Sequence, residues 1–404
     1  MSKRAVAVLL ACFLTVFTSF AIRYGYGVLL PEMLPSLAIT KAEAGVIFSA
    51  FFIGYTALAP ILGLLGDRFD ARILIAIFMA ILGVGAFLMS YSSSLIEASF
   101  FFALAGVGSS ATWAPVIAVA QRWVSDRRRG ITLAFIDVGS SVGIISGGLI
   151  LPLIVGVYNW NTGWLSLGVL AFLVALVDLL LIRGRPTNVS DNKKSVLEKH
   201  NDKPIKATYA MLVRDNKFWL IGFAYLLTGF SIIIPFTFLS TYAVQEMMYS
   251  YGAAARLITV IGVGALVGKL GLGYVSDTVG RIRIMMICAV LIAASCLGMA
   301  FQNGESALIV FTALFGIGYG TIWAMYAASA SDYFSKKSAG GIVGLWTVFL
   351  GVGSLASPII AGWMADTTGT FKWSFILATA GAVASLILLV PVWKTSSTGL
   401  SENK

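Results

Sequence analysis

The stretch Gly63-Leu-Leu-Gly-Asp67-Arg-Phe-Asp-Ala-Arg72 is the part of this sequence that decides the fold, because a related stretch stands 210 residues further along the chain. The second stretch reads Gly273-Tyr-Val-Ser-Asp277 and continues to Gly280 and Arg283. Both copies follow a long apolar run and place a glycine four residues before an aspartate. A glycine at such a place permits a tight turn, and the charged residues after it suit a membrane surface.

Two further matches have the same offset of 210 residues. Gly106-Val-Gly108 is followed by Trp113, and Gly316-Ile-Gly318 is followed by Trp323. In addition, Arg129-Gly130 falls opposite Ala339-Gly340. Three matches at one offset, without a gap, predict that the chain consists of two related halves in parallel arrangement.

Apolar runs long enough to cross a bilayer lie between these motifs. Hydrophobic residues make up 58% of the 404 residues, charged residues make up 11%, and the mean hydropathy is +0.91. A water-soluble chain of this size needs more charged surface, whereas a hydrocarbon core of ~30 Å is crossed by about twenty apolar residues. We therefore predict an all-α membrane protein with twelve spans: 5–30, 43–65, 72–91, 96–120, 130–155, 162–182, 217–242, 253–275, 283–301, 305–330, 339–364 and 371–392.

The one long polar interruption divides the spans into two sets of six. Residues 1–182 form the predicted N-terminal bundle, 183–216 form a linker, and 217–404 form the C-terminal bundle. Lys and Arg alternate strongly between the connecting segments: 23 of the 28 flank one side of the membrane, nine of them between residues 183 and 217, and only 3 flank the other. The positive-inside rule then puts both termini and the linker in the cytoplasm, with the chain in the cytoplasmic (inner or plasma) membrane.

The basic residues are thus explained by orientation in the lipid bilayer. A nucleic-acid-binding protein would gather them on one folded face, so the net charge of +10 does not indicate nucleic acid as a partner. The sequence also holds no paired carboxylates or nucleophile with its base at one depth, and no metal-ligand cluster or phosphate-binding glycine loop. We expect no enzyme activity, no cofactor and no metal, and we expect a monomer.

The loop after the second span resembles the motif that marks the major facilitator superfamily of transporters. The resemblance covers the whole chain and implies two six-helix bundles that alternate access to a site between them. It also implies a cytoplasmic gating latch, whose matching residues here are Gly63, Asp67, Arg68, Arg72, Gly273, Asp277 and Arg283. The sequence departs from the family pattern at Asp70, where the family has glycine, and at Thr278, where it has a basic residue.

Three ionisable residues fall deep inside predicted spans, where each costs several kcal/mol unless it is paired or hydrated. They are Arg23 in the first span, Asp137 in the fifth and Lys269 in the eighth. Asp137 and Lys269 stand at about 10 Å and 12 Å from the cytoplasmic ends of their helices. We expect these opposite charges to pair across the interface between the halves when the cytoplasmic side is closed, and release of Asp137 to couple transport to protons. A fourth residue, Asp178, lies near enough to the end of the sixth span to reach the interfacial water.

Two cations against one anion favour an anionic substrate. The stretch from Gly268-Lys269 to Gly273 resembles the substrate-binding part of oxalate–formate antiporters and monocarboxylate transporters, which implies that Lys269 and Arg23 bind the substrate. The sequence departs from that branch by a Lys in place of Arg, which offers a point charge and no bidentate fork. Aromatic residues along the candidate path complete the predicted binding residues: Tyr24, Tyr26, Trp113, Tyr319 and Trp323.

The sequence therefore predicts secondary transport of a small organic anion, a monocarboxylate or dicarboxylate, by proton symport or anion exchange. The alternative is a proton-coupled efflux antiporter for drugs or metabolites. Gly139, Gly143 and Gly147 resemble the glycine motif of such exporters, although small residues at every fourth position serve close helix packing equally well. Against export, the fourth span lacks the arginine that those proteins carry before Gly106.

Overall fold

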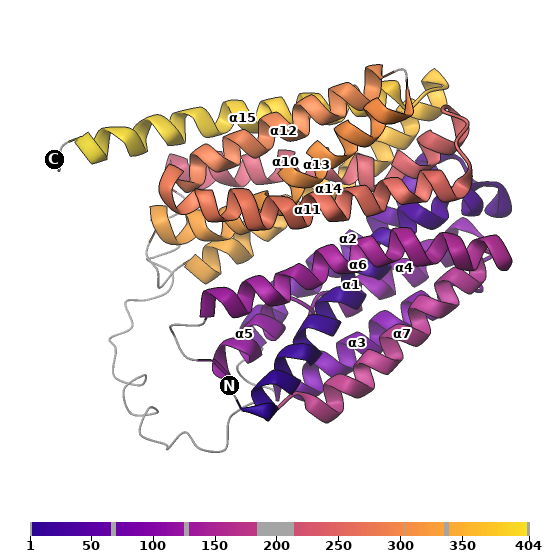
Figure 1. Cartoon of the computed structure of the whole chain (residues 1–404), viewed down its shortest axis with the longest axis horizontal. Coiled ribbons are helices and arrows are strands. Elements are labelled where there is room, and N and C mark those ends of the chain that lie inside the picture. Colours follow the sequence, from indigo (N-terminus) through magenta and orange to yellow (C-terminus); the bar gives the residue numbers. More distant parts are fainter. Residues whose placement is uncertain are drawn as a thin grey trace.

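The structure is a computed structural model that describes residues 2–65, 70–124, 129–183, 214–302, 304–334 and 339–401. These residues form thirteen helices: α1 (Lys3–Leu37), α2 (Lys41–Leu65), α3 (Ala71–Met89), α4 (Leu95–Ser109), α5 (Ala114–Arg122), α6 (Arg129–Val157), α7 (Trp160–Leu181), α10 (Asn216–Gln245), α11 (Tyr251–Val279), α12 (Arg281–Phe301), α13 (Glu305–Tyr333), α14 (Ala339–Thr368) and α15 (Lys372–Ser401). Figure 1 shows them as two bundles, with both chain ends on the same side of the molecule.

Twelve spans among the described residues are long and apolar enough to cross a membrane, as the sequence predicts. α4 and α5 together make the fourth span, which is broken at residues 110–113, a detail that the apolar pattern does not predict. α1 is longer than expected, because the helix continues through Pro31 and Pro35 to Leu37. A proline removes a single backbone donor, and the turn beyond Pro31 is held by the buried side chains of Met33 and Leu34.

The two halves repeat the same helix–helix contact at matching glycines. A Cβ on Gly106 of α4 would overlap the carbonyl oxygen of Phe51 in α2. A Cβ on Gly316 of α13 would overlap the carbonyl oxygen of Ile261 in α11. Both glycines and both of their partners are related by the same 210 residues. The matching glycines therefore serve one purpose in each half: they let two helices pack backbone to backbone.

The two halves touch along α2 with α14, α6 with α11, and α1 with α10. At the end away from the chain termini, the Asp366 carboxylate accepts hydrogen bonds from the backbone N–H groups of Lys41 and Ala42, at 3.1 and 2.8 Å. Nearer the middle, the Ser49 hydroxyl donates to the Leu355 carbonyl at 2.6 Å. These contacts fasten the halves to each other at that end.

Glycines nearer the other end of the same helices face open space. A Cβ on Gly130 of α6, on Gly271 or Gly273 of α11, or on Gly344 of α14 would have no atom within 4 Å. Glycines further along the same interface, such as Gly262 of α11, would clash with the opposite half. The halves are thus packed together at the end away from the termini and stand apart at the end that carries them.

Candidate substrate site between the halves

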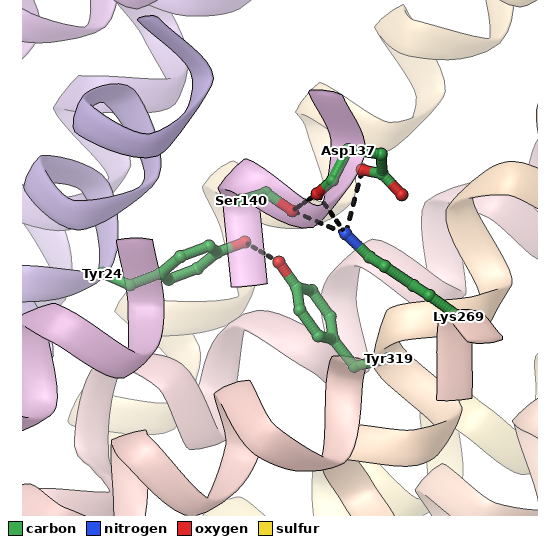
Figure 2. Close-up of polar contacts among 5 residues, drawn as sticks. All are labelled: Tyr24, Asp137, Ser140, Lys269 and Tyr319. Atoms are coloured by element: carbon green, nitrogen blue, oxygen red, sulfur yellow. Dashed lines mark hydrogen bonds and ion pairs between the residues drawn. The ribbon is translucent and has the colours of Figure 1, made fainter. Parts of the chain in front are cut away.

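Lys269 of α11 and Asp137 of α6 form an ion pair across the interface, with 2.9 Å between Nζ and Oδ1 (Figure 2). Their matched depths in the sequence predict this contact. The expectation that the pair belongs to the state closed at the cytoplasmic side stays a prediction.

The positive charge of Lys269 is fully engaged. Besides the carboxylate, its ammonium donates to the Asp137 carbonyl oxygen at 2.8 Å and to the Ser140 hydroxyl oxygen at 2.6 Å. The Lys269 side chain is 10% exposed and that of Asp137 is 28% exposed. An ammonium has three donors, and all three have acceptors here. Lys269 therefore adds no net charge to the interface in this arrangement.

Arg23 of α1 is also a buried cation, but unlike Lys269 it has no carboxylate partner among the described residues. Its side chain is 8% exposed. One guanidinium nitrogen donates to the Ser109 hydroxyl at 3.0 Å, and the Nε–H has no partner. Four rings surround the guanidinium carbon at 4.8 to 5.8 Å, those of Phe20, Phe51, Phe52 and Tyr55. Rings attract a cation but do not neutralise it, so the uncompensated positive charge of the interior lies at Arg23.

Ser109, the hydrogen-bond partner of Arg23, is held in place by further hydroxyl groups near the break between α4 and α5. The Ser109 and Ser19 hydroxyls are 2.8 Å apart. Thr112 donates to one of the two acceptors in its reach, the Ser19 hydroxyl at 3.0 Å or the Ser109 carbonyl at 2.7 Å. Sequence reasoning missed these residues, although the run Ser109-Ser-Ala-Thr112 inside an apolar span is a visible signal.

Tyr24 and Tyr319 join the halves beside the ion pair. The Tyr319 hydroxyl donates to the Tyr24 hydroxyl at 3.3 Å, and Figure 2 shows both rings pointing their hydroxyls toward each other close to Ser140 and Lys269. Phe236 of α10 stacks on Tyr24 with 3.9 Å between ring centroids and contacts Tyr319 edge-on at 4.7 Å. Trp323, partly buried, contacts Tyr319 at 6.0 Å. The structure thus brings together Tyr24, Tyr319 and Trp323 from the predicted set.

Tyr26 and Trp113 lie elsewhere. Tyr26 is fully buried inside the N-terminal half, where its hydroxyl donates to the Ala44 carbonyl at 2.7 Å and its ring stacks on Phe102 at 5.1 Å. The side chain two residues after Tyr24 on a helix points to a different face, so Tyr26 does not share the position of Tyr24, and its contact with a substrate stays a prediction. Trp113 caps the start of α5 and is 40% exposed, and it makes no hydrogen bond or ring contact with Arg23 or the ion pair within the described residues.

Two arginines at the second copy of the gating motif have different partners. The Asp277 carboxylate pairs with Arg281 at 2.6 Å, and Arg281 also reaches Asp332 of α13 at 3.7 Å. Arg283 instead places its guanidinium over the Trp393 ring, 5.7 Å from the centroid. Asp277 near the end of α11 thus pairs with Arg281 at the start of α12, and the latch role of Arg283 stays a prediction.

The first copy is described only in part. Asp67 and Arg68 lie outside the described residues, and Gly63 falls in the last turn of α2. The Asp70 carboxylate accepts a hydrogen bond from the backbone N–H of Arg72 at 3.0 Å and so caps the start of α3. Capping gives a reason for an aspartate at the position where the family has glycine.

Asp178 corrects another expectation. Its side chain is completely buried, and the Thr15 hydroxyl donates to its carboxyl group with 2.9 and 3.0 Å to the two oxygens. α7 runs on past it, Ile182 is fully buried, and the Trp123 indole donates to the Arg183 carbonyl at 2.7 Å. These contacts cover the end of α7, so Asp178 does not reach the interfacial water.

No three His, Cys, Asp or Glu side chains gather as a metal site would need in the described part of the chain.

The glycine row of α6 packs against α1. A Cβ on Gly139 would stand 2.8 Å from the Phe13 carbonyl oxygen, and one on Gly143 would overlap that of Phe17. Gly147, the next in the row, would keep 3.8 Å from the Ala21 carbonyl oxygen. Close packing of two helices accounts for this row, so the glycines give no separate support to the export alternative.

Twelve spans in two repeated halves, with charged and aromatic residues buried where the halves meet, define a polytopic membrane transporter. The sequence model of the Major Facilitator Superfamily matches residues 12–271 and 223–404. The chain belongs to this superfamily, as the gating motif and the repeat predict.

Curated relatives cover most of the chain at low identity. A hexuronate transporter of Bacillus subtilis is 20% identical over 96% of this chain and 94% of its own length. An Arabidopsis thaliana protein named for glycerol-3-phosphate transport is 25% identical, over 85% and 73%. Monocarboxylate transporter 12-B of Danio rerio is 24% identical, over 83% and 75%. Fungal relatives of 26 and 27% identity have names that give no substrate.

Among solved structures, a variant of the nucleoside transporter NupG superposes with a TM-score of 0.78. The alignment covers 95% of this chain and 99% of that one, at 14% sequence identity. At this identity the likeness concerns the fold alone. It agrees with the helix order and the two-bundle arrangement seen here.

Proposed function

We propose that this chain is a secondary transporter that moves a small organic anion by alternating access, with Arg23 as the residue that attracts the anion. One observation carries the proposal: Arg23 is a buried guanidinium that has a free Nε–H and lacks a carboxylate partner within the described residues. A lone buried cation is costly in a membrane protein. An anion that enters the site relieves that cost, so the site favours an anionic substrate over a neutral or cationic one.

The named relatives support the same chemistry. Hexuronate, glycerol-3-phosphate and monocarboxylates are different compounds, yet each is a small organic molecule that carries negative charge. These names support an organic anion more broadly than the oxalate–formate and monocarboxylate branch alone. A cationic drug would meet an uncompensated like charge at Arg23, which disfavours the export alternative.

The proposed cycle places the open end in the cytoplasm. The positive-inside rule puts both termini there, so the arrangement described above would face the cytoplasm, with the outer ends packed. The Lys269–Asp137 pair then lies between the packed outer ends and the open cytoplasmic ends of the two halves. Rocking of the halves would make and break the pair there. An anion that draws Lys269 away would leave Asp137 able to take up a proton, which would couple the anion to proton movement.

Uptake by reconstituted vesicles tests the proposal. The purified protein would be offered four labelled anions: pyruvate, 4-hydroxybenzoate, glucuronate and glucose 6-phosphate, each with and without an inward proton gradient, with protein-free vesicles as the blank. We expect saturable uptake of at least one anion. Saturable uptake of none of the four, together with uptake of a neutral or cationic tracer such as uridine or ethidium, would overturn the proposal.

The same vesicles test the role of Asp137. We expect Asp137→Asn to bind the anion but to lose accumulation driven by the proton gradient, with Glu32→Gln, an exposed carboxylate outside the site, as the matched control. Full gradient-driven accumulation by Asp137→Asn would leave the residue with a structural role only.

A further inference from the structure

Six residues from both halves, Arg23 and five aromatic residues, lie where the halves meet, and we call this set the interface ring. Its members are Arg23, Tyr24, Tyr55, Tyr225, Tyr319 and Trp323. Two helices of the N-terminal half, α1 and α2, supply the first three, and two of the C-terminal half, α10 and α13, supply the others. Five of the six side chains are aromatic. Tyr55 contacts the free cation directly, and Tyr24, next to Arg23 in the chain, connects it to the aromatic residues of the other half through Tyr319.

Pairwise contacts link the members on each side of the interface. The Arg23 guanidinium lies 4.8 Å from the Tyr55 ring centroid. Tyr225 contacts Trp323 at 5.6 Å between centroids. The remaining links are those of Trp323 with Tyr319 and of Tyr319 with Tyr24, given above, and Tyr24 follows Arg23 in the chain. Tyr55 and Trp323 are partly exposed, so the ring keeps open aromatic surface.

The charge on the ring suits one negative charge. Arg23 is its single cation, and Lys269 beside it is already neutralised by Asp137. A monocarboxylate would bring the charge of the site to zero. A phosphate monoester carries about −1.5 to −2 at neutral pH and would leave excess negative charge inside the membrane.

The hydrogen-bonding groups on the ring suit a substrate with few hydroxyls. The Tyr24 and Tyr319 hydroxyls are bonded to each other, and Ser109, which contacts Arg23, is bonded to Ser19. A sugar acid that buried a hydroxyl on each carbon here would leave most of them without partners, and each such group weakens binding. Flat aromatic rings make more favourable stacking contacts with an aromatic substrate than with a polyhydroxylated one.

We infer that the interface ring binds an aromatic monocarboxylate, with the carboxylate at Arg23 and the flat body against the partly exposed rings of Tyr55 and Trp323. This inference rests on the proposed organic-anion transport and narrows it to one class of substrate. It separates this chain from its relatives named for hexuronate and glycerol-3-phosphate, whose compounds carry several hydroxyls or a phosphate.

The four-anion panel in vesicles tests the inference when it is combined with variants of Trp323. We expect 4-hydroxybenzoate to exceed glucuronate at least tenfold in kcat/KM. Trp323→Leu should raise the KM for 4-hydroxybenzoate about fivefold to tenfold and leave that for pyruvate unchanged, because only the aromatic body stacks on the indole. Trp323→Phe should restore most of the affinity. Trp363→Leu, on a side chain that is 59% exposed on α14, is the matched control.

The outcomes distinguish the inference from the proposed function. Uptake of glucuronate or glucose 6-phosphate in preference to 4-hydroxybenzoate would overturn the inference and leave organic-anion transport standing. Equal KM values for 4-hydroxybenzoate in the Trp323→Leu and wild-type proteins would also overturn it. Uptake of none of the four anions, together with uptake of uridine or ethidium, would refute the proposed function and the inference together.

Discussion

Neutralising the Lys269–Asp137 pair one residue at a time should destabilise the protein unequally. Removing one partner of a buried ion pair costs about 3–5 kcal/mol, because the other charge is left without compensation. Asp137→Asn leaves Lys269 at 10% exposure without a counter-ion, because the acceptors that remain are the neutral amide oxygen, the Ser140 hydroxyl and the backbone carbonyl of residue 137. We expect a loss near the low end of that range, about 3 kcal/mol. Lys269→Gln leaves Asp137 at 28% exposure, where water reaches the carboxylate, and should cost about 1–2 kcal/mol.

The double variant is the sharper test of this reasoning. With both charges removed, neither side chain needs a counter-ion, so Asp137→Asn combined with Lys269→Gln should lie within about 1 kcal/mol of wild type. Three free cysteines give the assay, since Cys12, Cys288 and Cys296 are buried and react with a thiol-reactive dye only as the protein unfolds. The expected order of unfolding midpoints is wild type, double variant, Lys269→Gln and then Asp137→Asn. A double variant whose loss equals the sum of the two single losses would refute the pairing argument.

Further perturbations test the orientation and the packing. Single cysteines placed in 183–216 should stay unlabelled by impermeant thiol reagents in intact cells and become labelled once the cells are opened; ready labelling in intact cells would invert the orientation. Gly143→Ala should lower the thermal unfolding midpoint strongly because its Cβ would overlap the Phe17 backbone, whereas Gly147→Ala in the same row should be tolerated; equal midpoints would contradict the packing seen here. Thr15→Val should cost about 1–3 kcal/mol, because it removes the hydroxyl that bonds the buried Asp178, and Asp178→Asn should cost less because the amide oxygen still accepts that bond; the reverse order would refute this account of the contact.

Most of the fold could be predicted because the bilayer imposes it. A span must be long, apolar and helical, so its position is visible in one sequence, and the repeat places the spans in two halves. What the pattern could not give was local backbone detail. α1 continues through Pro31, and the hydroxyls of Ser110 and Thr112 bond to nearby backbone carbonyls at the break over residues 110–113. An apolar pattern does not encode either feature.

The site was partly predictable for a related reason. Depth along a helix follows from counting residues, and that was enough to match Asp137 with Lys269. Direction around the helix is harder to obtain from a span that is apolar on every side, and for this reason Tyr26 was grouped with Tyr24 although it points into the core. The same limit applies to Arg281 and Arg283, which are both near Asp277 in sequence but face different partners.

The account depends most directly on Arg23, and uptake of the four-anion panel by Arg23 variants tests it. The comparison needs three proteins beside wild type: Arg23→Gln, Arg23→Lys, and Arg4→Gln as a matched loss of one exposed positive charge. Loss of a charge-assisted hydrogen bond of about 2–3 kcal/mol predicts a fall of roughly 30-fold to 150-fold in kcat/KM for the transported anion in Arg23→Gln. Arg23→Lys should retain part of the activity and Arg4→Gln all of it. Wild-type kinetics in Arg23→Gln would contradict the central claim that this buried cation attracts the substrate.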